Sequence, residues 1–223
     1  MRSFPQAFEN RTAAGIELAH AIERRAPHNP ELVLGLPRGG VPVAYEVARA
    51  LSVPLDVMPV RKIGMPGNRE FAIGAIAGRT VVRESSLAPH VSTRVFKELA
   101  RRERVELIRR ERIYRAGLPP LNVEGMTVLL VDDGLATGST MLAAVREARR
   151  LKAKVVLVAA PVASDNAEAL VRAEADATIV LEISVELTSV GAWYEDFSQV
   201  GDSEVCELLA RSRPALKPLS YAT

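Results

Sequence analysis

The residues best suited to chemistry are two adjacent aspartates, Asp132 and Asp133, in the stretch VLLVDDGLATGST over residues 128–140. The apolar residues before the acids predict a buried strand, and the residues after position 138 have the spacing of a helix. In an open parallel sheet, ligands bind beyond the carboxyl ends of the strands. The acids and the loop that follows them are therefore a candidate binding site.

The loop over residues 134–140 has the composition of a phosphate-binding loop. It precedes a predicted helix, whose free N–H groups and dipole favour an anion. Its glycines let the backbone approach closely and its hydroxyls add hydrogen-bond donors; these residues are Gly134, Gly138, Thr137, Ser139 and Thr140. Carboxylates would repel a phosphate, but they accept hydrogen bonds well from vicinal hydroxyls. A phosphate and a diol held side by side describe a ribose 5-phosphate.

Two common nucleotide-binding motifs do not fit this stretch. A Walker A loop needs Gly-Lys-Ser/Thr, which the chain lacks, and no GxGxxG turn follows a predicted strand. The plainer alternative is an ordinary strand–loop–helix connection in which Asp133 caps the helix. The combination of two acids, two glycines and three hydroxyls favours a binding site.

The same stretch resembles the thirteen-residue phosphoribosyl-pyrophosphate signature of the type I phosphoribosyltransferases. The resemblance extends in element order over roughly residues 31–197. It implies an α/β fold with a Rossmann-like, mostly parallel twisted sheet, flanking helices and a small hood. It implies that Asp132 and Asp133 bind the ribose 2′- and 3′-hydroxyls. It assigns the 5-phosphate to Gly134, Leu135, Ala136, Thr137, Gly138, Ser139 and Thr140.

A second turn, GLPRGG over residues 35–40, follows the predicted strand 31–35. Taken alone, an arginine over bare glycine backbone suits a pyrophosphate. It suits an ordinary strand-to-helix turn with a solvated arginine equally well. The resemblance assigns this turn to the pyrophosphate loop, with Arg38, Gly39 and Gly40 in contact with the ligand.

Residues 61–70, RKIGMPGNRE, have the composition of a flexible loop, with Gly, Pro and Asn beside two adjacent cations. An ordinary solvated loop is the alternative. The resemblance implies a loop that closes over the reaction centre, where Arg61 and Lys62 neutralise the leaving pyrophosphate. No residue is an obvious general base, and Asp133 and Asp196 are the candidates. The sequence here is similar to a poorly characterised bacterial branch with R-K-x-G-x-P-G-N and W-Y-x-D-F.

The stretch VGAWYEDF, residues 190–197, falls in the hood that the resemblance implies for residues 184–223, with the N-terminus as a further contributor. An aromatic side chain of such a hood stacks on the acceptor base. Trp193, Tyr194 and Phe197 are candidates for stacking, and Asp196 could accept a hydrogen bond from a ring N–H. Packing within the protein is the alternative for each of them.

The elements that must position these residues follow from the apolar runs. Continuous apolar strands alternating with helices predict a mostly parallel sheet covered on both faces. The predicted strands are 31–35, 55–60, 71–77, 80–84, 125–131, 154–162 and 177–183. The predicted helices are 9–25, 41–51, 93–116, 138–151 and 165–174, and the last 40 residues look irregular. The 223 residues fit one domain, residues 1–223.

The predicted helix 93–116 is strongly basic, since residues 94–115 hold nine cations and four acids, a net charge of +5. Ion pairs along the helix, such as Arg94 with Glu98, explain this pattern as an exposed face. A nucleic-acid surface is the alternative, which the lack of interleaved aromatic residues disfavours. One cysteine, Cys206, and the absence of a signal-like or membrane-spanning run predict a cytoplasmic protein with no membrane partner.

The resemblance implies transfer of a 5-phosphoribosyl group from phosphoribosyl pyrophosphate to a nitrogen acceptor, which we expect to be a nucleobase. It implies Mg2+ on the pyrophosphate and ribose oxygens, and a homodimer; protein ligands to the metal are unknown. Two alternatives stay open, a regulatory protein that senses the donor without catalysis and an RNA-binding regulator.

Overall fold

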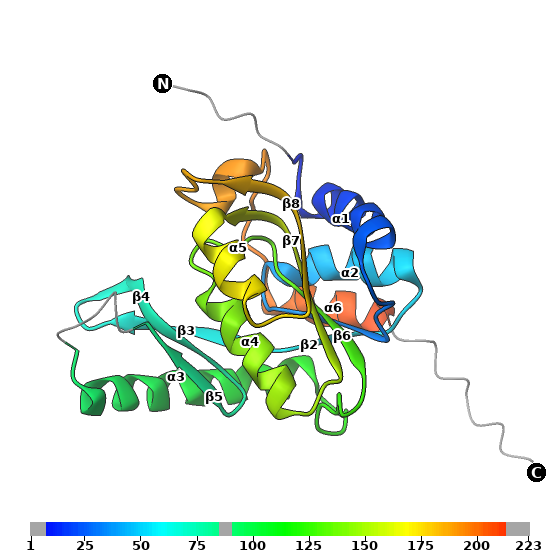
Figure 1. Cartoon of the computed structure of the whole chain (residues 1–223). Coiled ribbons are helices and arrows are strands. Elements are labelled where there is room, and N and C mark those ends of the chain that lie inside the picture. The colour runs from blue at the N-terminus through cyan, green and yellow to red at the C-terminus, as the bar shows by residue number, and fades with distance from the viewer. Residues whose placement is uncertain (1–7, 85–90, 213–223) are drawn as a thin grey trace, which may run out of the picture.

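The structure is a computed structural model that describes residues 8–84 and 91–212. Its centre is a five-stranded parallel sheet. In sheet order the strands are β2 (Leu55–Val57), β1 (Leu32–Gly35), β6 (Thr127–Val131), β7 (Val155–Ser164) and β8 (Ala177–Ser184). Figure 1 shows helices on both faces of this sheet, so the predicted α/β fold class is confirmed.

Each central strand is buried on both faces, which explains its continuous apolar sequence. In β6, Val128 and Leu130 face one core, and Leu129 and Val131 face the other. The first core is covered by α4 (Ser139–Arg150) and α5 (Asp165–Arg172), and the second by α1 (Arg11–Arg25), α2 (Gly40–Leu51) and α6 (Asp202–Ser212). The central strands are thereby packed between two helical layers.

A three-stranded antiparallel sheet lies to one side, at the lower left of Figure 1. Its strands are β3 (Val60–Met65), β4 (Asn68–Ala77) and β5 (Thr80–Arg83), and α3 (Thr93–Tyr114) packs along it. Ile63, Ile73, Ile76 and Phe96 form a small core between this sheet and α3. The long charged helix is thus confirmed, and its apolar side covers the second sheet.

Two predictions about the connection between the sheets are wrong. Residues 55–60 are not one strand, because Met58 and Pro59 carry the chain out of the parallel sheet before β3 begins. Residues 61–70 are not an irregular loop, but a hairpin whose turn contains Gly67 at a φ of 81°. The pairing shifts register around Gly64, which breaks the alternation by which a strand is recognised. Movement of the hairpin tip stays a prediction.

The end of the chain is more regular than its sequence indicates. A short 3-10 helix, η1 (Val190–Trp193), precedes the eleven-residue helix α6, so the expectation of an irregular C-terminus is wrong. Only Val205 and Leu209 of α6 are buried, a stripe too short to stand out as a helical period. Residues 213–223 of the predicted hood lie outside the described residues, and the hood as a unit stays a prediction. Within the described part of the chain, no helix is long and apolar enough to cross a membrane.

Candidate active site

A cleft of about 1160 Å3 opens at the carboxyl ends of β1 and β6. Five segments line it: the turn after β1, the β3–β4 hairpin, one side of α3, the loop after β6 and part of residues 188–197. The predicted site residues that line the cleft are Arg38, Gly39, Arg61, Lys62, Asp132, Asp133, Gly134, Ala136, Thr137 and Thr140. The predicted residues that do not line it are Gly40, Leu135, Gly138, Ser139, Trp193, Tyr194 and Asp196.

The two aspartates lie directly after β6, where the strand carries them to the floor of the cleft. The backbone N–H of Asp133 donates to Oδ1 of Asp132 at 2.9 Å. Burial raises the pKa of Asp132 well above its ordinary value, and the neighbouring charge of Asp133 raises it further. Burial also raises the pKa of Asp133, against the lowering effect of Arg11. Incompletely compensated carboxylates in a cleft are typical of functional sites.

Arg11, the first residue of α1, is the partner of Asp133 that sequence reasoning missed. Its Nε and Nη2 lie 2.9 and 2.8 Å from Oδ2 of Asp133. The two residues are 122 positions apart in sequence. Arg11 lies outside the acid–loop, GLPRGG, hairpin and WYEDF motifs, so no signal in the sequence could have found it.

The glycine pair after β1 allows the turn to pack against the acids. A Cβ atom on Gly39 would lie 1.9 Å from Oδ2 of Asp133, and one on Gly40 would lie 2.8 Å from Oδ1 of Asp132. Since real Cβ atoms do not approach so closely, both positions exclude larger residues. Arg38 stands beside this contact and lines the cleft, with its Nη1 3.9 Å from Oδ1 of Asp202.

The loop after the acids ends at the N-terminus of α4, as predicted. Gly138 precedes the helix in the left-handed region at a φ of 77°, which favours glycine. Thr137 Oγ1 lies 2.9 Å from Ser139 Oγ. Leu135 is buried and pairs with β7, because its N–H donates to Val162 O at 2.9 Å. The loop is therefore anchored by Leu135, while Ala136, Thr137 and Thr140 face the cleft.

The two cations of the hairpin differ in their surroundings. Arg61 donates two hydrogen bonds to Oε2 of Glu103 on α3, at 2.9 and 2.8 Å. Lys62 is exposed and has no hydrogen-bond or ion-pair partner among the residues that the structure describes. Its charge lowers the pKa of Asp132 and so acts against the effect of burial.

The WYEDF segment contacts the acid pair through its tyrosine, and its phenylalanine packs on that tyrosine. The hydroxyl of the buried Tyr194 donates to the backbone oxygen of Asp133 at 2.6 Å. The Tyr194 ring packs against Phe8 and Phe197, and Phe197 lines the cleft. Asp196 accepts a hydrogen bond from Ser198 N at 2.9 Å. Contact of Trp193, Tyr194 or Asp196 with a base stays a prediction, and Phe197 is the aromatic residue of this segment that faces the cleft.

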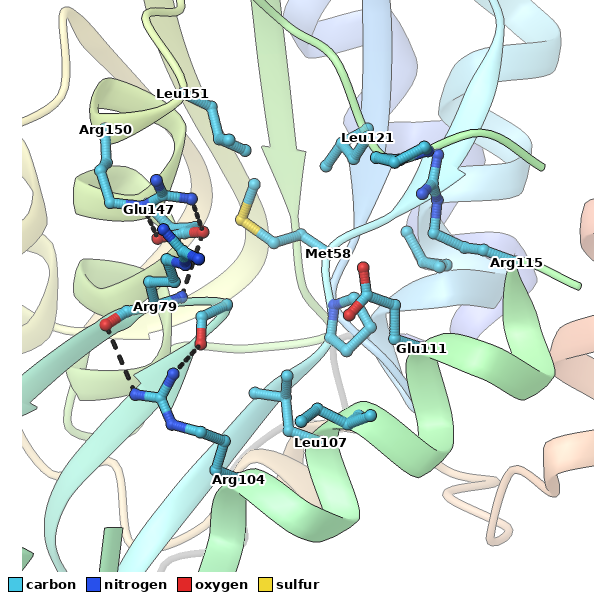
Figure 2. Close-up of a pocket in the computed structure, with 15 residues that line it drawn as sticks. Met58, Arg79, Arg104, Leu107, Glu111, Arg115, Leu121, Glu147, Arg150 and Leu151 are labelled. Carbon is cyan, nitrogen blue, oxygen red and sulfur yellow. Dashed lines mark hydrogen bonds and ion pairs between the residues drawn. The ribbon is translucent and has the colours of Figure 1, made fainter. Parts of the chain in front are cut away.

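A second, smaller pocket of about 330 Å3 lies where α3, α4 and the β4–β5 turn meet (Figure 2). Glu147 of α4 is buried there, and it accepts hydrogen bonds from Arg150, from Thr80 and from the backbone of Arg79. Arg104 of α3 donates to the backbone oxygens of Gly78 and Arg79 at 3.2 and 3.5 Å. These contacts tie the second sheet to the first, and no predicted site residue lines the pocket.

A parallel α/β sheet that holds an acid pair, a hydroxyl-rich loop and a glycine turn in one cleft beyond its strand ends has the arrangement in which α/β proteins bind ligands. The chain belongs to the phosphoribosyl transferase domain family, whose match covers residues 6–198. The resemblance drawn from the sequence is thereby confirmed.

Similarity to individual proteins agrees with the family. The chain is 38% identical over 208 residues to two Mycobacterium tuberculosis proteins, MT0597 (strain CDC 1551) and Rv0571c (strain H37Rv). Both carry the provisional name of phosphoribosyl transferase. Each match covers 92% of this chain and 47% of the relative, so the chain spans about half the length of these relatives. It is also 40% identical to TT1426 from Thermus thermophilus, with a TM-score of 0.76 over 93% of this chain and 99% of that one.

Proposed function

We propose that this chain is a phosphoribosyltransferase that moves a 5-phosphoribosyl group from phosphoribosyl pyrophosphate to a nitrogen acceptor and releases pyrophosphate. Family membership supports an enzyme of the glycosyltransferase type. The observation that carries the proposal is one cleft that combines the Asp132–Asp133 pair, the 134–140 loop, Arg38 and the cations Arg61 and Lys62. These groups match the three charged or hydroxylated parts of the donor.

Each part of the donor has a chemically suitable partner. The 134–140 loop would bind the 5-phosphate through N–H groups and hydroxyls at the N-terminus of α4. Asp132 and Asp133 would accept hydrogen bonds from the ribose hydroxyls. The pyrophosphate would extend toward Arg38 on one side and toward Arg61 and Lys62 on the other.

Reaction at C1 then needs positioning and electrostatic stabilisation. The bond from C1 to the pyrophosphate oxygen breaks with its electron pair on the leaving group, and the acceptor nitrogen forms the new bond to C1. Arg61 and Lys62 would stabilise the negative charge that develops on the pyrophosphate. Closure of the hairpin would exclude water and limit hydrolysis. Asp133 is the candidate base for the proton of the nitrogen, because burial raises its pKa.

A magnesium ion would enter with the donor, held by the oxygens of its pyrophosphate and ribose, and would neutralise the leaving group. The described residues contain no cluster of three or more His, Cys, Asp or Glu side chains that could hold a metal ion. Oxygen ligands from the donor fit this surrounding. A nucleobase as acceptor, a homodimer and a cytoplasmic location belong to the same proposal.

The test is pyrophosphate release by the purified protein with phosphoribosyl pyrophosphate, magnesium and a panel of purines, pyrimidines and other nitrogen heterocycles. Turnover with at least one acceptor is expected. Tight donor binding without turnover from any acceptor would replace the enzyme with a protein that senses the donor. The exposed ion pairs of Glu98 with Arg101 and of Glu106 with Arg109 on α3 favour an exposed structural face over an RNA surface.

A further inference from the structure

All three nitrogens of the Arg11 guanidinium contact other groups of the protein. Nε and Nη2 contact Asp133 Oδ2, and Nη1 donates to the backbone oxygen of Ser198 at 2.8 Å. The guanidinium carbon also lies 3.8 Å from the centre of the Phe197 ring, a cation–π contact. The Arg11 side chain is 11% exposed and does not line the cleft. Arg11 therefore stands behind the acid pair.

The backbone on both sides of this contact is fixed. Phe8 N–H donates to Trp193 O at 3.1 Å, and Glu195 N–H donates to Phe8 O at 2.9 Å. These bonds join the segment before α1 to the WYEDF segment. Tyr194 adds its hydroxyl bond to the backbone oxygen of Asp133. Arg11 thus meets Asp133 within a frame that also holds the backbone of Asp133.

The hydrogen bond from Arg11 Nε and the ion-pair contact from Nη2 both fall on one oxygen of the carboxylate, Oδ2, which is also the oxygen that faces Gly39. These contacts restrict the rotation of the carboxylate. They also supply a positive charge to one member of two adjacent, largely buried acids. Two such acids would otherwise repel each other and lose solvation.

We propose that Arg11 is a positioning residue of the donor site, which holds the Asp133 carboxylate in the rotation and charge state needed to bind the ribose diol. The inference rests on the proposed function and adds a residue to it. Arg11 acts through Asp133 and does not touch the donor. A purely structural ion pair between α1 and the loop after β6 would stabilise the fold without changing donor affinity, and the two roles are separable by experiment.

The experiment compares Arg11→Gln and Arg11→Lys with Arg24→Gln, a matched control on the exposed face of the same helix. Donor affinity is measured by calorimetry with phosphoribosyl pyrophosphate and magnesium, and folding by thermal unfolding. Loss of a charge-assisted pair predicts that Arg11→Gln weakens donor binding roughly 10-fold or more. Arg11→Lys keeps the charge but not the paired contact, so its loss is smaller. Arg24→Gln binds like the wild type.

A second measurement separates positioning from general damage. With the best acceptor, Arg11→Gln raises KM for the donor and leaves KM for the acceptor unchanged. If a folded Arg11→Gln variant binds the donor as tightly as the wild type does, this inference is wrong and the proposed function is unaffected. If the Gln variant does not fold, wild-type affinity in Arg11→Lys overturns it. A wild-type chain that binds no donor overturns the proposed function, and this inference with it.

Discussion

Carboxylates in two regions of this molecule have opposite surroundings, Glu147 in the second pocket and the acid pair in the cleft. In the second pocket, burial raises the pKa of Glu147, but hydrogen bonds from Arg150, Thr80 and the Arg79 N–H bring it below the ordinary value. In the cleft, burial raises the pKa of Asp132, and of Asp133 despite Arg11. Hydrogen-bond donors therefore compensate the charge of Glu147, which joins the two sheets. In the cleft, the hydrogen bonds and charges around Asp132 and Asp133 do not offset the cost of burial.

The cations follow this division at one position. Around the second pocket, Arg150 pairs with Glu147, and Arg115 pairs with Asp56 at 2.9 Å. In the cleft, Arg61 and Arg110 also pair with acids, Glu103 and Glu106. Lys62 differs, because it has no partner within the described ranges and its charge stays available for a ligand.

The largest expected effect comes from removing both carboxylates of the cleft. The double variant Asp132→Asn, Asp133→Asn replaces both charged acceptors for the ribose hydroxyls with neutral amides, which keep one weaker acceptor oxygen each. Two charge-assisted hydrogen bonds are worth about 1.5–3 kcal/mol each, so donor affinity should fall roughly 100-fold or more. Calorimetry with magnesium present measures it. Unchanged affinity in a folded double variant would show that the acid pair does not bind the diol.

The next effect concerns the rate of reaction. Arg61→Ala and Lys62→Ala should each remove about 2–4 kcal/mol of transition-state stabilisation and so lower kcat. The size is taken by analogy with loss of one preorganised electrostatic group. Donor affinity should change less, because the leaving charge develops only as the bond breaks. Arg101→Ala, an exposed cation on α3, is the control. A loss of donor affinity with unchanged kcat would assign these cations to donor binding alone.

The sequence was sufficient for the parallel sheet and for the centre of the site. Strands buried on both faces must be apolar throughout, as in β6 and β7, so they are visible as runs. The acid pair and the phosphate loop are contiguous because one strand end and one helix start supply both. Local sequence therefore predicts those parts of the site that lie within one strand–loop–helix unit.

Features that depend on contacts between distant segments were not predictable. Arg11 reaches Asp133 only because α1 packs beside the central strands, and no periodicity within either segment reports that contact. The composition of residues 61–70 indicates a loop, because glycines and a proline hide a strand whose register shifts. The sequence slightly favours packing over base stacking for Tyr194, but it gives no sign of the partner that the structure shows, the backbone oxygen of Asp133.

A smaller effect, on stability and not on donor binding, is expected where Glu147 links the two sheets. Glu147→Gln leaves donors of Arg150 and Thr80 poorly paired, so the free energy of unfolding should fall by about 1–3 kcal/mol at neutral pH. Because the folded pKa of Glu147 is lowered, its contribution is present above the unfolded pKa and is lost as pH falls through the folded value. The difference between variant and wild type should therefore shrink in acid.

Denaturant unfolding at pH 7 and pH 3 measures this difference, with Glu124→Gln as the control. Glu124 pairs with Lys152 on the exposed surface, where an ion pair contributes about 0–1 kcal/mol. Donor affinity should stay at the wild-type value in Glu147→Gln. A large loss of donor affinity without a loss of stability would remove the distinction between Glu147 and the acid pair of the cleft.

The smallest effect should have the opposite sign. Asp132→Asn should raise the free energy of unfolding at neutral pH by about 1 kcal/mol, in the range of single stabilising substitutions. The folded pKa of Asp132 is raised, so its contribution to stability is fully present below the unfolded pKa and is lost as pH rises through the folded value. Asparagine does not ionise and avoids this loss, while its Oδ1 can still accept the Asp133 N–H. Unfolding curves at pH 3 and pH 8 should therefore coincide with the wild type in acid and exceed it at pH 8. A variant that is less stable than the wild type at pH 8 would mean that Asp132 is as well compensated as Glu147, and the contrast between the two regions would not hold.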